Sequence, residues 1–142
     1  MNKFFDITTI EFKDTNTLIN LQTYPESFHT SLLPGIDKHL IKHLPALKYH
    51  LCDNEFSRTF PDELKDTEIA HAFEHVLLQK IGDLDPRAKA VKGETHWDWK
   101  KSPRFSYEID LVYRNDPVVL KAISSSIDVF RKITPAQLGA AS

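Results

Sequence analysis

Two histidines and a glutamate lie close together in one strongly helical stretch of the chain, as His71, Glu74 and His75. Histidines four residues apart share one face of an α-helix, so both imidazoles can reach a single metal ion. The glutamate then lies beside that ion, where its carboxylate can take a proton from a water molecule. This H-x-x-E-H spacing is typical of one class of zinc-dependent hydrolases. The sequence therefore predicts a Zn²⁺ site with His71 and His75 as ligands and Glu74 as the catalytic general base.

A hydrolytic zinc site usually has three protein ligands and leaves the fourth position open. Cys52 is the first candidate for the third ligand, because it follows the first predicted helix and could come close to the start of the helix that carries the motif. His96 and Asp110, both in a predicted β-hairpin, are the alternatives. The spacing of these residues does not decide among the three.

Glu74 occupies an unusual place on its helix. At helical spacing it falls among Leu77, Leu78 and Ile81, so a carboxylate interrupts an otherwise apolar face. An unpaired carboxylate is costly to bury there, and a metal ion, a protonated histidine or a cleft with water would offset that cost. The alternative is purely structural: both histidines hydrogen-bond to neighbouring groups, and Glu74 reaches solvent.

The elements before the motif follow from hydrophobic spacing. Apolar residues predict a first strand over residues 5–12 and a second over 18–21. A helix is predicted from Pro34 to about Leu51, with a kink at Pro45, because a proline inside a helix removes a backbone hydrogen bond. The polar stretch from 53 to 65 is expected to be a loop.

The motif helix and the segments after it have recognisable ends. Asp66 or Thr67 is expected to cap the start of the helix, and Gly82 is expected to end it. Two β-rich runs follow, over residues 88–99 and 104–113. In the second run apolar and polar residues alternate, which predicts a hairpin within an antiparallel sheet.

Asp116 is predicted to cap a last helix, with Pro117 at its first position. The resulting order, ββ-α-α-ββ-α, implies an α+β fold: a two-layer sandwich in which helices cover one face of an antiparallel sheet of about four strands. The sequence contains no internal repeat, low-complexity tract or linker. We therefore expect a single domain over residues 1–142, with its core between about 3 and 133.

Composition narrows the class of function. The 18 basic and 20 acidic residues nearly balance, so no basic surface indicates a nucleic-acid partner. No apolar run approaches the length of a membrane span, and the N-terminus lacks the apolar region of a signal peptide. A single cysteine excludes an internal disulfide, and a cytoplasmic setting is expected. The expected partner is a peptide or polymer substrate, and the sequence is compatible with a homo-oligomer.

Several short motifs occur in an order known from one protein family. They are Leu33-Pro34-Gly35, Leu44-Pro45-Ala46-Leu47, His50-Leu51-Cys52, and Thr67 followed by His71-Ala72-Phe73-Glu74-His75-Val76. In this order they resemble the N-terminal domain of cyanophycin synthetase, over about Leu18 to Val129. The chain departs from the family pattern where residues 54–58 replace a glycine-rich turn and where residues 94–97 replace an arginine-rich strand.

The resemblance carries expectations about activity. In some members of the family this domain looks like a metallohydrolase that cuts the cyanophycin polymer into primers. The motif is also similar to that of pitrilysin-type peptidases and of S-ribosylhomocysteine lyase, and the lyase uses a cysteine as third ligand, which keeps Cys52 in view. By resemblance, His71 and His75 would be ligands and Glu74 the base.

The sequence therefore favours a small zinc-dependent hydrolase that cleaves peptide or amide bonds in a peptide or a cyanophycin-like polymer. Two rival hypotheses remain. One is a non-catalytic binding module that holds a polymer or a partner protein. The other is a structural remnant in which the motif only completes the core.

Overall fold

The computed structural model describes residues 4–51, 59–88, 91–97, 103–133 and 138, and the structural statements below concern these residues. Within them, four antiparallel strands form one sheet in the order β1-β2-β4-β3. The strands are β1 (Phe5–Phe12), β2 (Thr17–Thr23), β3 (Gly93–His96) and β4 (Ser106–Leu111). Strand β3 therefore forms one edge of the sheet, next to β4.

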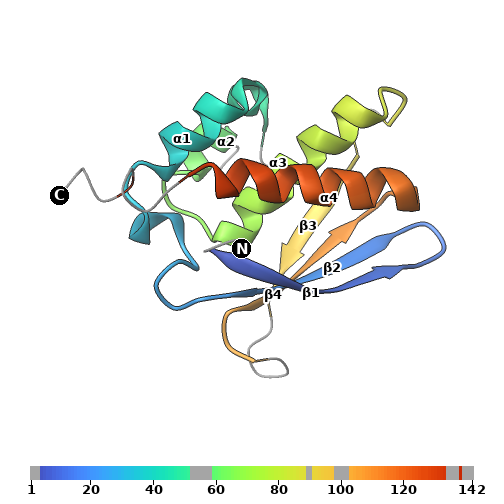
Figure 1. Cartoon of the computed structure of the whole chain (residues 1–142), viewed down its shortest axis with the longest axis horizontal. Coiled ribbons are helices and arrows are strands. Elements are labelled where there is room, and N and C mark those ends of the chain that lie inside the picture. The colour runs from blue at the N-terminus through green and yellow to red at the C-terminus, as the bar shows by residue number, and fades with distance from the viewer. Residues whose placement is uncertain (1–3, 52–58, 89–90, 98–102, 134–137, 139–142) are drawn as a thin grey trace.

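Helices cover one face of this sheet (Figure 1). They are α1 (Ile36–His43), α2 (Phe60–Glu63), α3 (Ile69–Leu84) and α4 (Asp116–Arg131), with 3₁₀ turns at Thr30–Leu32 and Pro45–Tyr49. The chain thus has the predicted α+β fold, an antiparallel four-stranded sheet under a helical layer. No helix in the described ranges is both long and apolar enough to cross a membrane.

The alternation predicted for the second half of the hairpin is confirmed in β4. Tyr107, Ile109 and Leu111 are buried, whereas the alternating residues Glu108 and Asp110 are only half-buried. Successive side chains of a strand point to opposite faces of the sheet. The apolar face of β4 therefore supports the helices, and the polar face points away from them.

Three phenylalanines fix the motif helix and the last helix on the sheet. Phe5 of β1 packs edge-to-face against Phe73 of α3, with ring centroids 4.9 Å apart, and against Phe130 of α4, at 5.3 Å. Such aromatic pairs add to the free energy of burial when their rings meet edge-to-face. Phe73 precedes Glu74 in the sequence, so the same anchor also sets the position of the motif.

Pro45 ends the first helix rather than kinking it. Helix α1 stops at His43, the backbone of Leu44 lies outside the helical region (φ −140°, ψ 77°), and Pro45 opens a 3₁₀ turn that runs to Tyr49. The residue before a proline is disfavoured in the helical region, so the chain leaves the helix at that point. The turn changes the direction of the chain and brings His50 towards the motif helix.

The segment predicted as a loop contains a short helix in its described part. Helix α2 begins at Phe60, whose side chain is completely buried. Its aromatic ring forms part of the candidate site.

The motif helix differs from its prediction at both ends. Glu68 is the N-cap, in place of Asp66 or Thr67, and its side chain makes no capping hydrogen bond. Gly82 lies inside the helix, which continues to Leu84. Packing of α3 against α4 outweighs the local tendency of glycine to end a helix.

The last helix begins at Asp116, one residue earlier than predicted, and Asn115 caps it in place of Asp116. The Asn115 side chain accepts a hydrogen bond from the backbone nitrogen of Val118. Val119 and Phe130 of this helix are buried in the core.

Candidate metal centre

His71, Glu74 and His75, here called the motif triad, converge on one point beside α3. Their candidate ligand atoms all lie within 4.8 Å of one another. All three come from two turns of one helix, so the spacing that predicted the site also builds it. The structure thus brings together both predicted histidines and the predicted base.

His75 is held as a neutral ring. It is buried, and the ring of Phe60 stacks on it with centroids 4.0 Å apart and planes 16° apart. Burial, assisted by the nearby His71 and His50, lowers the pKa of His75 to about 3. A neutral imidazole keeps a lone pair for a metal ion, so His75 needs to lose no proton before it binds one.

His71 lies at the half-buried edge of the triad. Its Nδ1 atom is 2.9 Å from the hydroxyl oxygen of Thr67, and that hydroxyl donates to the carboxylate of Glu68 at 3.2 Å. Phe60 also meets His71, edge-on, with centroids 6.0 Å apart. The two histidines are therefore oriented by one shared aromatic ring and by polar partners on their outer sides.

Glu74 is a buried carboxylate, only 5% exposed, with a hydrogen bond from the sheet. The hydroxyl of Thr95 in β3 donates to its Oε1 at 2.6 Å. Burial raises the pKa of Glu74, although the Thr95 hydrogen bond and the nearby His71 act in the opposite direction. A carboxylate that holds its proton more tightly than usual is a stronger base, as a proton-transfer role requires.

A glycine makes room for Glu74. A Cβ atom added to Gly93 would lie 3.3 Å from Cγ of Glu74 and 3.2 Å from a methyl group of Leu111. Both distances are shorter than ordinary carbon contacts. The absence of a side chain at Gly93 therefore lets β3 approach the motif helix closely enough for Thr95 to reach the carboxylate.

The structure separates two of the candidate third ligands, His96 and Asp110, from the triad. His96 borders the same cavity, but its Nε2 lies 3.1 Å from the carboxylate of Glu94. Asp110 is on the polar face of β4, where it accepts a hydrogen bond from Asn16 at 2.8 Å. Neither residue belongs to the group of converging ligand atoms in the described ranges. Cys52 lies outside the described residues.

His50 is the main residue of this centre that sequence reasoning missed. Its Nδ1 lies 3.0 Å from Nδ1 of His75, and its Nε2 lies 2.8 Å from Oε1 of Gln79. Pro45 was the sequence feature that bears on the position of His50, because the helix ends before this proline. The turn that begins there carries the chain back towards the motif helix. Thr95 was also missed, because only the strand register places its hydroxyl against Glu74.

An open cavity of about 630 Å³ gives access to the triad. Residues 91–97, which include β3, line the cavity together with α3. The exposed apolar side chains of Leu51 and Trp97 also line it, as do the carboxylates of Glu63 and Glu68. A substrate can therefore meet both apolar surface and negative charge close to the triad.

The metal-free protein should lose stability as the pH falls from about 6.5 towards 3. In the unfolded chain His75 titrates near 6.5, whereas in the folded chain its pKa is about 3. Between these values the unfolded state binds a proton that the folded state does not, which lowers the free energy of unfolding by up to about 1.4 kcal/mol per pH unit. Urea unfolding with a chelator at several pH values measures this slope.

His75→Gln should remove that part of the slope, and His39→Gln, on α1 and outside the triad and its contacts, should keep it. The raised pKa of Glu74 acts with the opposite sign, since its contribution to stability is lost as the pH rises. The difference in slope between wild type and His75→Gln gives the contribution of His75 alone. An identical pH dependence in wild type and His75→Gln would contradict the assignment of a neutral His75.

Comparison with known families agrees with this geometry. A family model described as the cyanophycin synthase-like N-terminal domain matches residues 18–135. The match runs from the second residue of β2 to just beyond α4 and includes the whole motif triad. Among curated proteins, none matches the chain. The match covers most of the sequence, and the chain belongs to the family of cyanophycin synthase-like N-terminal domains.

Proposed function

We propose that this chain is a zinc-dependent hydrolase that cleaves peptide or amide bonds. One observation carries the proposal: two histidines and a buried carboxylate converge within 4.8 Å beside an open cavity. Burying a carboxylate is unfavourable unless it is paired with another group, and a bound cation would offset this cost. The family supports a substrate of this kind, since its name refers to the synthesis of a polyamide.

The donor set suits zinc. Imidazole nitrogens and carboxylate oxygens are ordinary zinc ligands, and the low pKa of His75 removes competition from a proton. His71 and His75 would hold the ion, with Glu74 beside it. Cys52 remains the proposed third ligand, on the basis of the sequence.

When bound, zinc would supply a Lewis acid that lowers the pKa of a water molecule and polarises a carbonyl group. The protein's own part is proton transfer. Thr95 holds one oxygen of Glu74, which orients the carboxylate, and burial raises its proton affinity. Glu74 would accept the proton of the water as its oxygen adds to the carbonyl carbon, and would then pass that proton to the amide nitrogen, so that the carbon–nitrogen bond breaks and the amine leaves.

The purified protein should contain about one zinc ion per chain, as the donor set of two histidines and one carboxylate implies. Metal analysis before and after treatment with a chelator measures the content, and reconstitution should restore it. Hydrolysis of a peptide library and of cyanophycin is then assayed in both states. A protein that takes up no zinc on reconstitution would overturn the proposal.

A non-catalytic binding module is the second candidate. The number of metal ligands favours this candidate. Among the described residues only two histidines and one carboxylate converge, so if Glu74 is the base, no third ligand is left for the metal ion. In that case wild type and His71→Ala should bind the polymer equally, and neither should turn it over.

A further inference from the structure

We propose that two hydrogen-bond relays hold both histidines of the motif triad with the proton on Nδ1 and the lone pair on Nε2. The first, the Glu68 relay, runs from Glu68 through Thr67 to His71. The second, the Asp83 relay, runs from Asp83 through Gln79 and His50 to His75. The tautomers follow from these hydrogen bonds alone. Only the statement that the lone pairs bind zinc rests on the proposed function.

The position of one proton decides what a neutral histidine can do. One ring nitrogen then carries hydrogen and donates, and the other carries a lone pair and accepts. Only the nitrogen with the lone pair can bind a metal ion, and the hydrogen bond at the other nitrogen selects the tautomer. The ring of His75 is also fixed in its plane by the stacked Phe60, so its hydrogen bonds have set directions.

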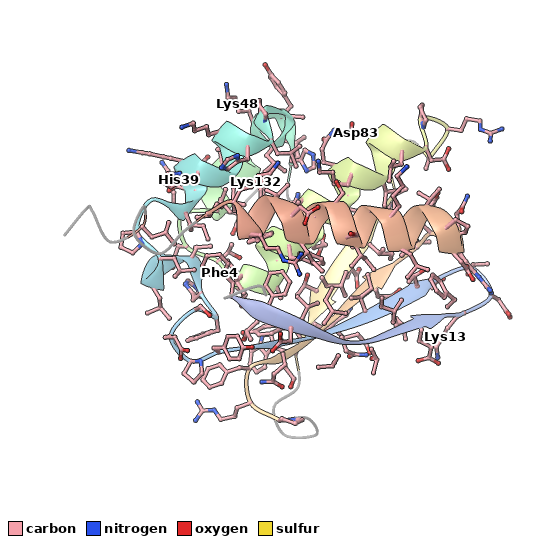
Figure 2. The ribbon with its side chains drawn as sticks, in the orientation of Figure 1. Phe4, Lys13, His39, Lys48, Asp83 and Lys132 are labelled. Carbon is pink, nitrogen blue, oxygen red and sulfur yellow. The ribbon has the colours of Figure 1, made fainter. Side chains whose placement is uncertain are left out.

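Asp83, at the outer end of its relay, determines which groups donate and which accept along it. Asp83 lies near the C-terminal end of α3, on the exposed surface of the helical layer (Figure 2). A carboxylate only accepts hydrogen bonds, so the amide nitrogen of Gln79 faces it, with Nε2 and Oδ1 3.0 Å apart. The amide oxygen of Gln79 must then point the other way, 2.8 Å from Nε2 of His50.

The inner half of this relay follows by the same reasoning. An amide oxygen also only accepts, so Nε2 of His50 carries a proton, and in the neutral form of that ring Nδ1 carries the lone pair. That lone pair lies 3.0 Å from Nδ1 of His75. A lone pair on both nitrogens would be repulsive at this distance, so Nδ1 of His75 carries the proton. Nε2 of His75 is then the nitrogen with the lone pair.

The Glu68 relay gives the same result for His71. The hydroxyl of Thr67 has one hydrogen, which it donates to Oε2 of Glu68 at 3.2 Å. Its oxygen is 2.9 Å from Nδ1 of His71 and can only accept there, so Nδ1 of His71 is protonated. In their neutral forms both histidines therefore carry the lone pair on Nε2.

The relay residues form a stripe along one helix face. Thr67, His71, His75, Gln79 and Asp83 follow one another at intervals of four residues, beginning just before α3 and running almost to its end. Residues four apart are neighbours on a helix surface, and Thr67 and His71, and Gln79 and Asp83, are hydrogen-bonded pairs at this spacing. His50 is the one member that comes from another element, and it links His75 to Gln79.

Long-range ¹H–¹⁵N NMR of the metal-free, full-length chain reads directly which ring nitrogen carries the proton. In wild type, His71 and His75 should both be protonated at Nδ1 and bare at Nε2. Gln79→Met removes the acceptor for His50, and the spectrum of His75 should then show protonation at Nε2 as well. Zinc affinity of the same variant should fall about 10–100-fold, the usual effect of losing an outer-shell partner of a metal ligand.

Matched variants separate the relays from general damage to the helix. Lys80→Met makes a similar change at the next position of α3 and should keep wild-type tautomers and zinc affinity. Thr67→Val replaces the hydroxyl by a methyl group of similar size and should change the tautomer of His71 alone. Thr67→Ser keeps the hydroxyl and should give the wild-type spectrum. A histidine of the triad that is protonated at Nε2 in the wild-type chain would overturn the inference, whatever its variants do.

The two proposals fail in different ways. If the wild-type tautomers are as inferred but no zinc binds, the relays stand and the hydrolase proposal is wrong. If zinc binds and either histidine is protonated at Nε2 in its absence, the relays are wrong and the hydrolase proposal stands.

Discussion

Replacing Glu74 by glutamine should leave zinc bound while hydrolysis falls by about 10²–10⁴-fold, the range that general acid–base groups contribute. Glutamine has almost the same shape, and its amide oxygen can still accept the hydrogen bond from Thr95. It cannot accept a proton from water, so the step proposed for Glu74 is lost while the binding surface remains. Zinc content and the turnover of a cleaved peptide, measured on the same preparation, check both halves of the result.

Glu108→Gln makes the same chemical change on the outer face of β4 and should leave turnover unchanged. The Glu74→Gln variant should also remain folded, because the substitution removes a carboxylate that burial disfavours. Turnover equal to that of wild type in Glu74→Gln would show that another group is the base.

His71→Ala should weaken zinc binding by more than the 10–100-fold that the loss of an outer-shell partner costs, because it removes a ligand itself. His71 is the better histidine to remove, since it is half-buried, whereas His75 is buried under Phe60 and its loss would also open a cavity. Competition with a chromogenic zinc chelator measures the affinity. Circular dichroism shows whether the fold is retained.

The same titration tests the other candidate ligands. His96→Ala and Asp110→Asn should keep wild-type affinity, because neither side chain joins the converging group in the described part of the chain. His39→Ala is the control for a histidine outside the site. A drop in Cys52→Ser equal to that of His71→Ala would identify the third ligand. Wild-type affinity in His71→Ala would instead show that zinc binds elsewhere.

The parts of the centre that could be predicted from sequence are those that depend on local geometry. His71, Glu74 and His75 come together because one helix determines their spacing. The buried face of β4 was predictable for a similar reason, because alternation along a strand is a property of the strand itself.

The parts that could not be predicted depend on contacts between distant segments. His50 reaches His75 only because the chain leaves α1 before Pro45 and turns back over the motif helix. Thr95 meets Glu74 only through the register of β3 on β4 and the space left at Gly93. Helix ends were misplaced because packing decides them more than local preference does.

The stripe of polar residues along α3 has a consequence for how binding and turnover respond to damage. The two histidines lie on a single helix, and Thr67, the hydrogen-bond partner of His71, comes just before it, so the spacing of the histidines depends on contacts that are short in sequence. The orientation of Glu74, the proposed base, depends on the hairpin, through the bond from Thr95. A substitution that loosens the hairpin should therefore lower the rate of bond cleavage well before it releases the metal ion.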